Sequence, residues 1–83
     1  MPNRPPCFAR LAYDAATSTG YLHFSDGSRY AYPDTDLDDL QAVANALRPG
    51  TTFNATLRRA DPPYTRITTW PTAPTWTARF KGP

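Results

Sequence analysis

The residues of this sequence that could do chemistry are few: one cysteine, one histidine, seven acidic residues that are all aspartates, and eight arginines. A metal site needs three or four convergent Cys, His or carboxylate ligands, and neither a C-x-x-C nor an H-x-x-x-H spacing occurs. Nucleophilic catalysis by Cys7 and His23 would require a third group that orients the imidazole. Helix capping accounts for the aspartates at positions 34–39, which makes an acid–base pair a poor interpretation. We therefore predict a protein without metal, cofactor, catalytic residues or enzymatic activity.

Arginines are concentrated in the second half of the chain, where they could form a nucleic-acid surface. Guanidinium groups suit phosphate, and a tyrosine offers a ring on which a base can stack. If the helices and the last strand converge, an RNA- or DNA-binding surface would consist of Arg48, Asn54, Arg58, Arg59, Tyr64 and Arg66. The competing interpretation is ordinary solvated charge, with Arg58 paired to an acidic side chain or capping a carbonyl.

Large aromatic residues near the C-terminal end of the chain indicate a protein interface. Trp70, Trp76 and Phe80 lie in a segment rich in Pro and Thr, and exposed aromatic side chains are common anchors of interfaces. Residues 76–81 alternate apolar and polar side chains, so they could add as a strand to the sheet edge of another chain, including a second copy. The same segment could instead return to its own sheet as an edge strand. Docking on a protein partner through the sheet edge and this aromatic extension is our leading prediction, and nucleic-acid binding is the alternative.

The size and charge of the chain restrict the class of protein. With 83 residues it forms at most one domain, and a domain of this size buries only about 60–65 % of its unfolded surface, which leaves little area for a large cleft. The net charge of +2 divides into −3 for residues 1–47 and +5 for residues 48–83. A single cysteine excludes an internal disulfide, and no apolar run is long enough for a membrane span or a signal peptide. These features predict a cytoplasmic protein without membrane contact.

Two strands joined by a tight turn follow a first strand at Phe8–Tyr13. The dipeptide Asp26-Gly27 between residues 21–25 and 28–32 is a strong hairpin signal. A two-residue loop would divide the apolar residues between the two faces of the sheet. A three-residue loop with Gly27 in the left-handed conformation instead pairs Leu22 with Tyr30 and collects the apolar side chains on one face. We therefore predict the three-residue loop, with Tyr21, His23, Arg29 and Ala31 on the opposite face.

Helical periodicity follows the hairpin. An amphipathic helix is predicted over residues 34–48, and Thr35 with Asp38 has the spacing of a capping box. The apolar stripe of this helix contains Leu37, Leu40, Val43, Ala44 and Leu47. A second, short helical segment is predicted over residues 51–59, with Phe53 and Leu57 on its buried side. Residues 64–70 have the β-branched and aromatic composition of a strand.

These residues together resemble a known family, the KTSC domain. The similarity covers residues 8–67 and is carried by 11–14 (LAYD), Leu22, Phe24, Gly27, Tyr30, Tyr32, the helix around Leu40, Gly50, 53–58 (FNATLR) and 64–67 (YTRI). The chain departs from the family at Arg48-Pro49-Gly50, where a Ser-x-Gly turn is common, and at Asp36, where a proline often precedes the helix. The resemblance implies a β-meander followed by a helix. It also implies a small stand-alone protein of bacterial or phage type, and it implies no defined activity.

The predicted fold is α+β: a three-stranded antiparallel β-meander packed by one main α-helix and a short second helix, with a C-terminal extension. Residues 1–6 are predicted to be a disordered arm, residues 7–67 the KTSC-like domain, and residues 68–83 the Pro/Thr/Trp-rich extension.

Overall fold

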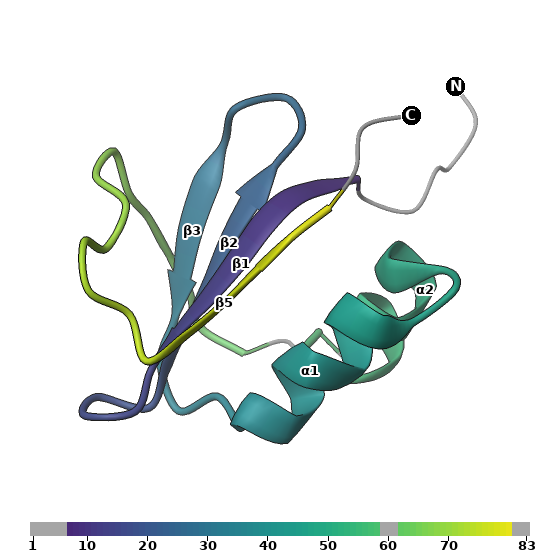
Figure 1. Cartoon of the computed structure of the whole chain (residues 1–83), viewed down its shortest axis with the longest axis horizontal. Coiled ribbons are helices and arrows are strands. Elements are labelled where there is room, and N and C mark those ends of the chain that lie inside the picture. Colours follow the sequence, from purple (N-terminus) through teal and green to yellow (C-terminus); the bar gives the residue numbers. More distant parts are fainter. Residues whose placement is uncertain (1–6, 59–61, 81–83) are drawn as a thin grey trace.

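The computed structural model describes residues 7–58 and 62–80, so the predicted arm at residues 1–6 and the side chain of Arg59 lie outside the described residues. The chain forms one sheet with two helices on one of its faces (Figure 1). In chain order the elements are β1 (Phe8–Asp14), β2 (Thr19–Phe24), β3 (Arg29–Tyr32), α1 (Leu37–Asn45), α2 (Pro49–Ala55), β4 (Thr65–Arg66) and β5 (Trp76–Arg79). The α+β class is confirmed, but the described sheet has five strands in the order β4-β3-β2-β1-β5 instead of three.

The hairpin between β2 and β3 has the predicted register. Leu22 lies opposite Tyr30, and the amide of Phe24 donates to the carbonyl of Ser28 at 2.9 Å. Gly27 has a φ of 95°, which an L side chain rarely adopts, and the three-residue loop requires it there. The hairpin therefore sends Leu22 and Tyr30 toward the helices, and the side chains that alternate with them toward the opposite face.

The core lies between the helices and the inner face of the sheet, which we define as the face that α1 and α2 cover. Leu11, Leu22 and Leu40 are completely buried there. Three aromatic side chains contact the Phe53 ring of α2, namely Phe8, Phe24 and Tyr32, with centroid distances of 5.4–6.2 Å, and the rings of Phe8 and Phe24 stack on each other at 5.0 Å. This aromatic cluster supplies much of the apolar area that a chain of this size can bury.

The main helix is shorter than its apolar periodicity predicts. The helix α1 ends at Asn45, and Leu47, predicted to lie in the buried stripe, is fully exposed. The chain leaves the helical conformation at Ala46, which has φ −76° and ψ 148°. Pro49, which begins α2, also keeps the residue before it out of the helical conformation, and Arg48 has φ −126° and ψ 82°. The predicted capping box is also wrong: the residue that precedes the helix is Asp36, without a side-chain cap, and the Thr35 hydroxyl donates to the carbonyl of Tyr32.

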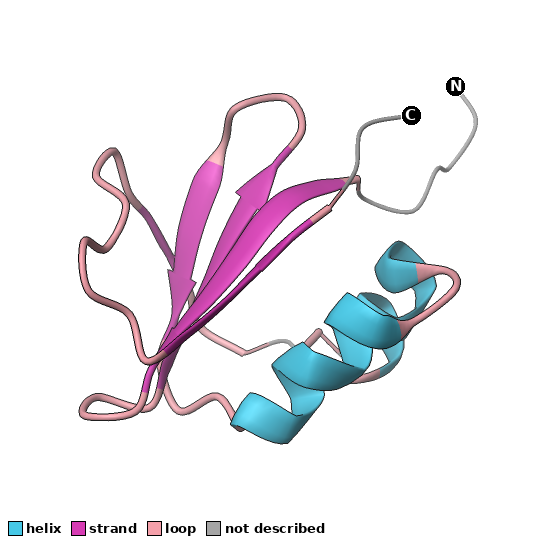
Figure 2. Cartoon of the chain, viewed as in Figure 1, coloured by secondary structure: helices cyan, strands magenta, loops and turns pink. Residues whose placement is uncertain are grey.

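Residues 67–75, which we term the crossing segment, connect the two opposite edges of the sheet. Because the helices cover the inner face, this segment passes over the outer face (Figure 2). Hydrogen bonds fix both ends: the amide of Ile67 donates to the carbonyl of Arg29 at 2.9 Å, and that of Thr75 to the carbonyl of Tyr13 at 2.7 Å. The chain beyond residue 67 thus rejoins its own sheet, where β5 pairs with β1. Within the described ranges, neither helix is long and apolar enough to cross a membrane.

The two leucines at positions 40 and 47 test where the core ends. We expect Leu40→Ala to lower the free energy of unfolding by about 2–5 kcal/mol, because it removes a completely buried side chain and leaves a cavity. The matched control Leu47→Ala should change it by no more than about 0.5 kcal/mol. Urea denaturation followed by tryptophan fluorescence measures both, and similar losses in the two variants would contradict this placement of the core.

Candidate functional site

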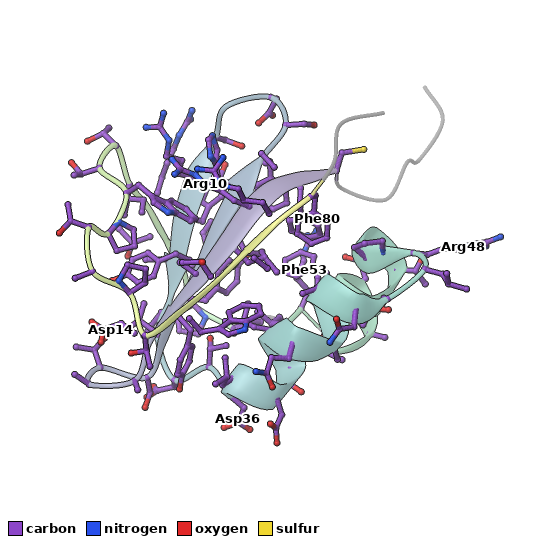
Figure 3. All side chains as sticks on the ribbon, in the orientation of Figure 1. Arg10, Asp14, Asp36, Arg48, Phe53 and Phe80 are labelled. Carbon is purple, nitrogen blue, oxygen red and sulfur yellow. The ribbon has the colours of Figure 1, made fainter. Side chains whose placement is uncertain are left out.

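The residues predicted for a nucleic-acid surface are only partly brought together. Tyr64, 58 % exposed, stacks on Tyr32 at 5.4 Å, and the guanidinium of Arg58 lies 5.8 Å from the centre of the Phe53 ring. The rings of Tyr32 and Phe53 contact each other with their centroids 6.0 Å apart, so Tyr64 and Arg58 are linked only indirectly, through these two rings. The other described residues of the set are all exposed but belong to different places, namely Arg48 before α2, Asn54 within α2 and Arg66 in β4. Figure 3 shows Arg48 at the end of the helical layer, pointing away from the sheet.

The aromatic residues predicted as a protein interface all contact their own domain. Trp76 and Phe80 are half-buried and pack against the core, and the Phe80 ring lies 5.6 Å from that of Phe8. Trp70 belongs to the crossing segment and is half-buried against the outer face. Of the two paths left open for residues 76–81, the described part, 76–80, follows the return to its own sheet: residues 76–79 pair with β1, and the amide of Phe80 donates to the carbonyl of Ala9.

The structure assembles a different group of charged residues, which was not predicted as a site. The register places Arg29 opposite His23, His23 opposite Arg10, and Arg10 opposite Arg79. Side chains that lie directly opposite each other share a face of the sheet, and neighbouring strands are about 4.8 Å apart. Three arginines and a histidine therefore form one row across β3, β2, β1 and β5 on the outer face, which we term the cationic row. Figure 3 shows Arg10 on the side away from the helices, with nitrogen atoms of other side chains around it.

A β-bulge in β1 lets Phe8 and Arg10 point to opposite faces of the sheet. The pairing of β1 with β2 shifts between Phe8, opposite Phe24, and Arg10, opposite His23. Phe8 thus keeps its place in the core while Arg10 points outward, although the two are two residues apart and would share a face in a regular strand. Alternation from the inward Leu11 and Tyr13 places Arg10 on the outer face, and the bulge is what keeps Phe8 in the core.

Trp70 covers the centre of the row. The guanidinium carbon of Arg10 lies 4.4 Å from the centre of the Trp70 ring, within the range of a cation–π interaction. The rings of His23 and Tyr21 lie 5.6 and 6.1 Å from that of Trp70. Trp70 therefore fastens the crossing segment to the outer face, and it adds an aromatic surface to the cationic row.

Hydrogen bonds orient the side chains of the row. Nε of Arg10 donates to Nδ1 of His23 at 2.9 Å, so Nδ1 is the acceptor and a neutral imidazole carries its proton on Nε2. Nη1 of Arg29 donates to the carbonyl of Thr68 in the crossing segment at 2.8 Å. Nε of Arg29 is buried and has no hydrogen-bond partner among the described residues. The row is thus fixed in position, and one of its donors is unsatisfied.

Burial and, after it, neighbouring like charges shift the pKa values of two groups in the row. Burial, together with the charges of Arg79 and Arg29, lowers the pKa of Arg10. Burial and the charges of Arg10 and Arg29 lower the pKa of His23, and Asp26 opposes them only in part. The contributions of the neighbouring arginines to both shifts are those of a positively charged face, as an anion-binding surface requires.

The chemistry of the described residues leaves few other sites. Among residues 7–58 and 62–80, no three His, Cys or Asp side chains lie close enough together to hold a metal ion. Comparison with known proteins adds no further information: no family model, no curated protein and no solved structure matches this sequence. The outer face is therefore interpreted from its own geometry.

The histidine of the row makes stability depend on pH. Since the pKa of His23 is lowered in the folded state, the unfolded chain binds the proton more tightly. This contribution to stability is complete above the ordinary histidine pKa of about 6.5 and is lost as the pH falls through the lower folded value. We expect the free energy of unfolding to decrease below about pH 6.5, and His23→Gln, which retains an acceptor but does not titrate, to reduce this decrease. Urea denaturation between about pH 8 and 5 tests it, and equal pH profiles for the two proteins would contradict it.

Proposed function

We propose that this protein is a small, non-enzymatic binding module that holds the phosphate backbone of a single-stranded nucleic acid on the outer face of its sheet. The observation that carries the proposal is the cationic row, in which Arg29, Arg10 and Arg79 lie on three of four consecutive strands. Arginine is suited to this role because its planar guanidinium binds phosphate oxygens through two parallel hydrogen bonds.

The energetic state of the row supports an anionic ligand. Side chains of like charge that lower the pKa of Arg10 oppose one another in the free protein. The unpaired Nε of Arg29 adds a further cost, because a buried donor without a partner destabilises a fold by about 1–3 kcal/mol. Because of these two costs, the row contributes little to the stability of the fold. A bound phosphate would relieve the repulsion between the arginines. A role in binding explains why such a row is present.

The aromatic part of the outer face favours a single strand over a duplex. Trp70 and Tyr21 lie beside the row and are half-buried, so part of each ring remains accessible. Unpaired bases stack on aromatic side chains at about 1–3 kcal/mol each, whereas the bases of a duplex are already stacked. A sheet face that combines arginines with aromatic rings is also a common platform for single-stranded RNA.

This proposal keeps the nucleic-acid alternative inferred from the sequence but assigns it to other residues. Arg48 and Arg58 remain exposed on the helical side, where the described residues form no row of comparable order. The resemblance to the KTSC domain, a bacterial or phage accessory role and a cytoplasmic location are part of the same proposal. They are compatible with a small domain that binds without catalysing a reaction.

A salt titration tests the proposal. We expect an oligouridine of about 12 nucleotides, labelled with fluorescein, to bind with a slope of log K against log salt of about −2, because three arginines neutralise phosphates at about 0.7 ions each. An oligothymidine of the same length separates RNA from DNA, and a hairpin duplex should bind more weakly. Fluorescence anisotropy gives all the affinities.

Two matched variants locate the surface. Arg79→Gln removes an exposed charge of the row and should weaken binding and reduce the slope by about 0.7, whereas Arg48→Gln removes the same charge elsewhere and should change neither. Absence of binding, a salt-independent affinity, or a larger effect of Arg48→Gln would each contradict the proposal.

A further inference from the structure

The edge of the sheet formed by β5 could bind a ligand of a different class, a protein segment. We infer that β5 binds an extended segment of a partner protein in which acidic side chains alternate with apolar ones. The segment would add to the sheet as a further antiparallel or parallel strand. This inference goes beyond nucleic-acid binding and does not depend on it.

The backbone of β5 offers hydrogen-bonding groups along one side. β5 is the last strand of the sheet, and no described residue pairs with its outer side. The amide of Phe80 donates inward to the carbonyl of Ala9 at 3.0 Å. Because successive residues of a strand direct their peptide groups to opposite sides, the amides and carbonyls of Thr77 and Arg79 point away from β1. These are the groups that an added strand would pair with.

The two faces of this edge differ in chemistry. Toward the outer face, β5 presents Thr77 and Arg79, both exposed, and Arg79 lies opposite Arg10. Toward the inner face it presents Trp76, Ala78 and Phe80, which are half-buried against the core. Side chains of an added strand would alternate between these faces. Carboxylates would meet the arginines of the outer face, and apolar side chains would cover the exposed parts of Trp76 and Phe80.

Charge complementarity distinguishes this partner from a second copy of the chain. Pairing of β5 with β5 of another copy would join two cationic rows on one continuous face. Arg79 and Arg10 already repel each other within one copy, since Arg79 lowers the pKa of Arg10. The carboxylates of an acidic strand would instead attract Arg79 and Arg10 across the edge.

The experiment uses a pair of synthetic peptides of about eight residues, blocked at both ends and labelled with fluorescein: one alternates Glu with Val and the other alternates Lys with Val. The full chain should bind the Glu-Val peptide at least tenfold more tightly than the Lys-Val peptide. Thr77→Pro removes one outward amide and should weaken binding about tenfold, the effect of one lost hydrogen bond, whereas Thr77→Val keeps the amide and should not. Equal affinity for both peptides, or equal affinity of both variants, would overturn the inference.

A charge reversal keeps the test decisive if Thr77→Pro fails to fold. Arg79→Glu leaves the backbone of β5 unchanged, and we expect it to reduce the preference for Glu-Val over Lys-Val at least tenfold, since an exposed carboxylate then faces the peptide. An unchanged preference would overturn the inference. Sedimentation velocity of the free chain tests whether a second copy occupies the edge. If the chain forms a dimer that Thr77→Pro dissociates, and if the Glu-Val peptide does not bind, the edge belongs to a second copy and the inference is overturned.

Discussion

The contact between Arg10 and Trp70 is the interaction on which the outer half of this structure depends. The strands β4 and β5 lie on opposite edges of the sheet, so the chain between them has to cross one face, and the helices occupy the other. Trp70 anchors that crossing at its midpoint, with the guanidinium 4.4 Å from its ring. The same contact orders β5 indirectly, because β5 begins only where the crossing segment reaches the far edge.

This constraint explains how a domain with a small core has an ordered charged surface. In the part of the chain that the structure describes, the helices form one layer on the inner face, and the crossing segment passes over the outer face. The crossing segment is too short to cover the whole face, so the ends of the cationic row at Arg29 and Arg79 are only half-buried and exposed, respectively. The incomplete cover leaves arginines accessible beside the Trp70 ring. They create the positive surface that the proposed ligand would neutralise.

Local signals in the sequence predicted local structure, and contacts between distant residues were harder to predict. The turn at Asp26-Gly27 determined the register of the hairpin, and the alternation that follows from it placed His23 and Arg29 on the outer face. The row itself was missed because pairing of β1 with β2 and with β5 brings Arg10 together with His23 and Arg79, which lie far from it in the chain. The partial exposure of Trp70 likewise depends on the path of the crossing segment, which composition does not specify. Most elements of the fold can thus be predicted from the sequence, whereas the site depends on how those elements pack against one another.

The most direct test of the central claim is to map the contact surface of an oligonucleotide residue by residue. A titration of the ¹⁵N-labelled chain with oligouridine, followed by heteronuclear NMR, reports the backbone amides, the arginine Nε groups and the indole of Trp70. We expect the largest shift changes at Arg10, Arg29, Arg79 and Trp70. Changes confined to the helical side, around Arg48 and Arg58, would contradict it.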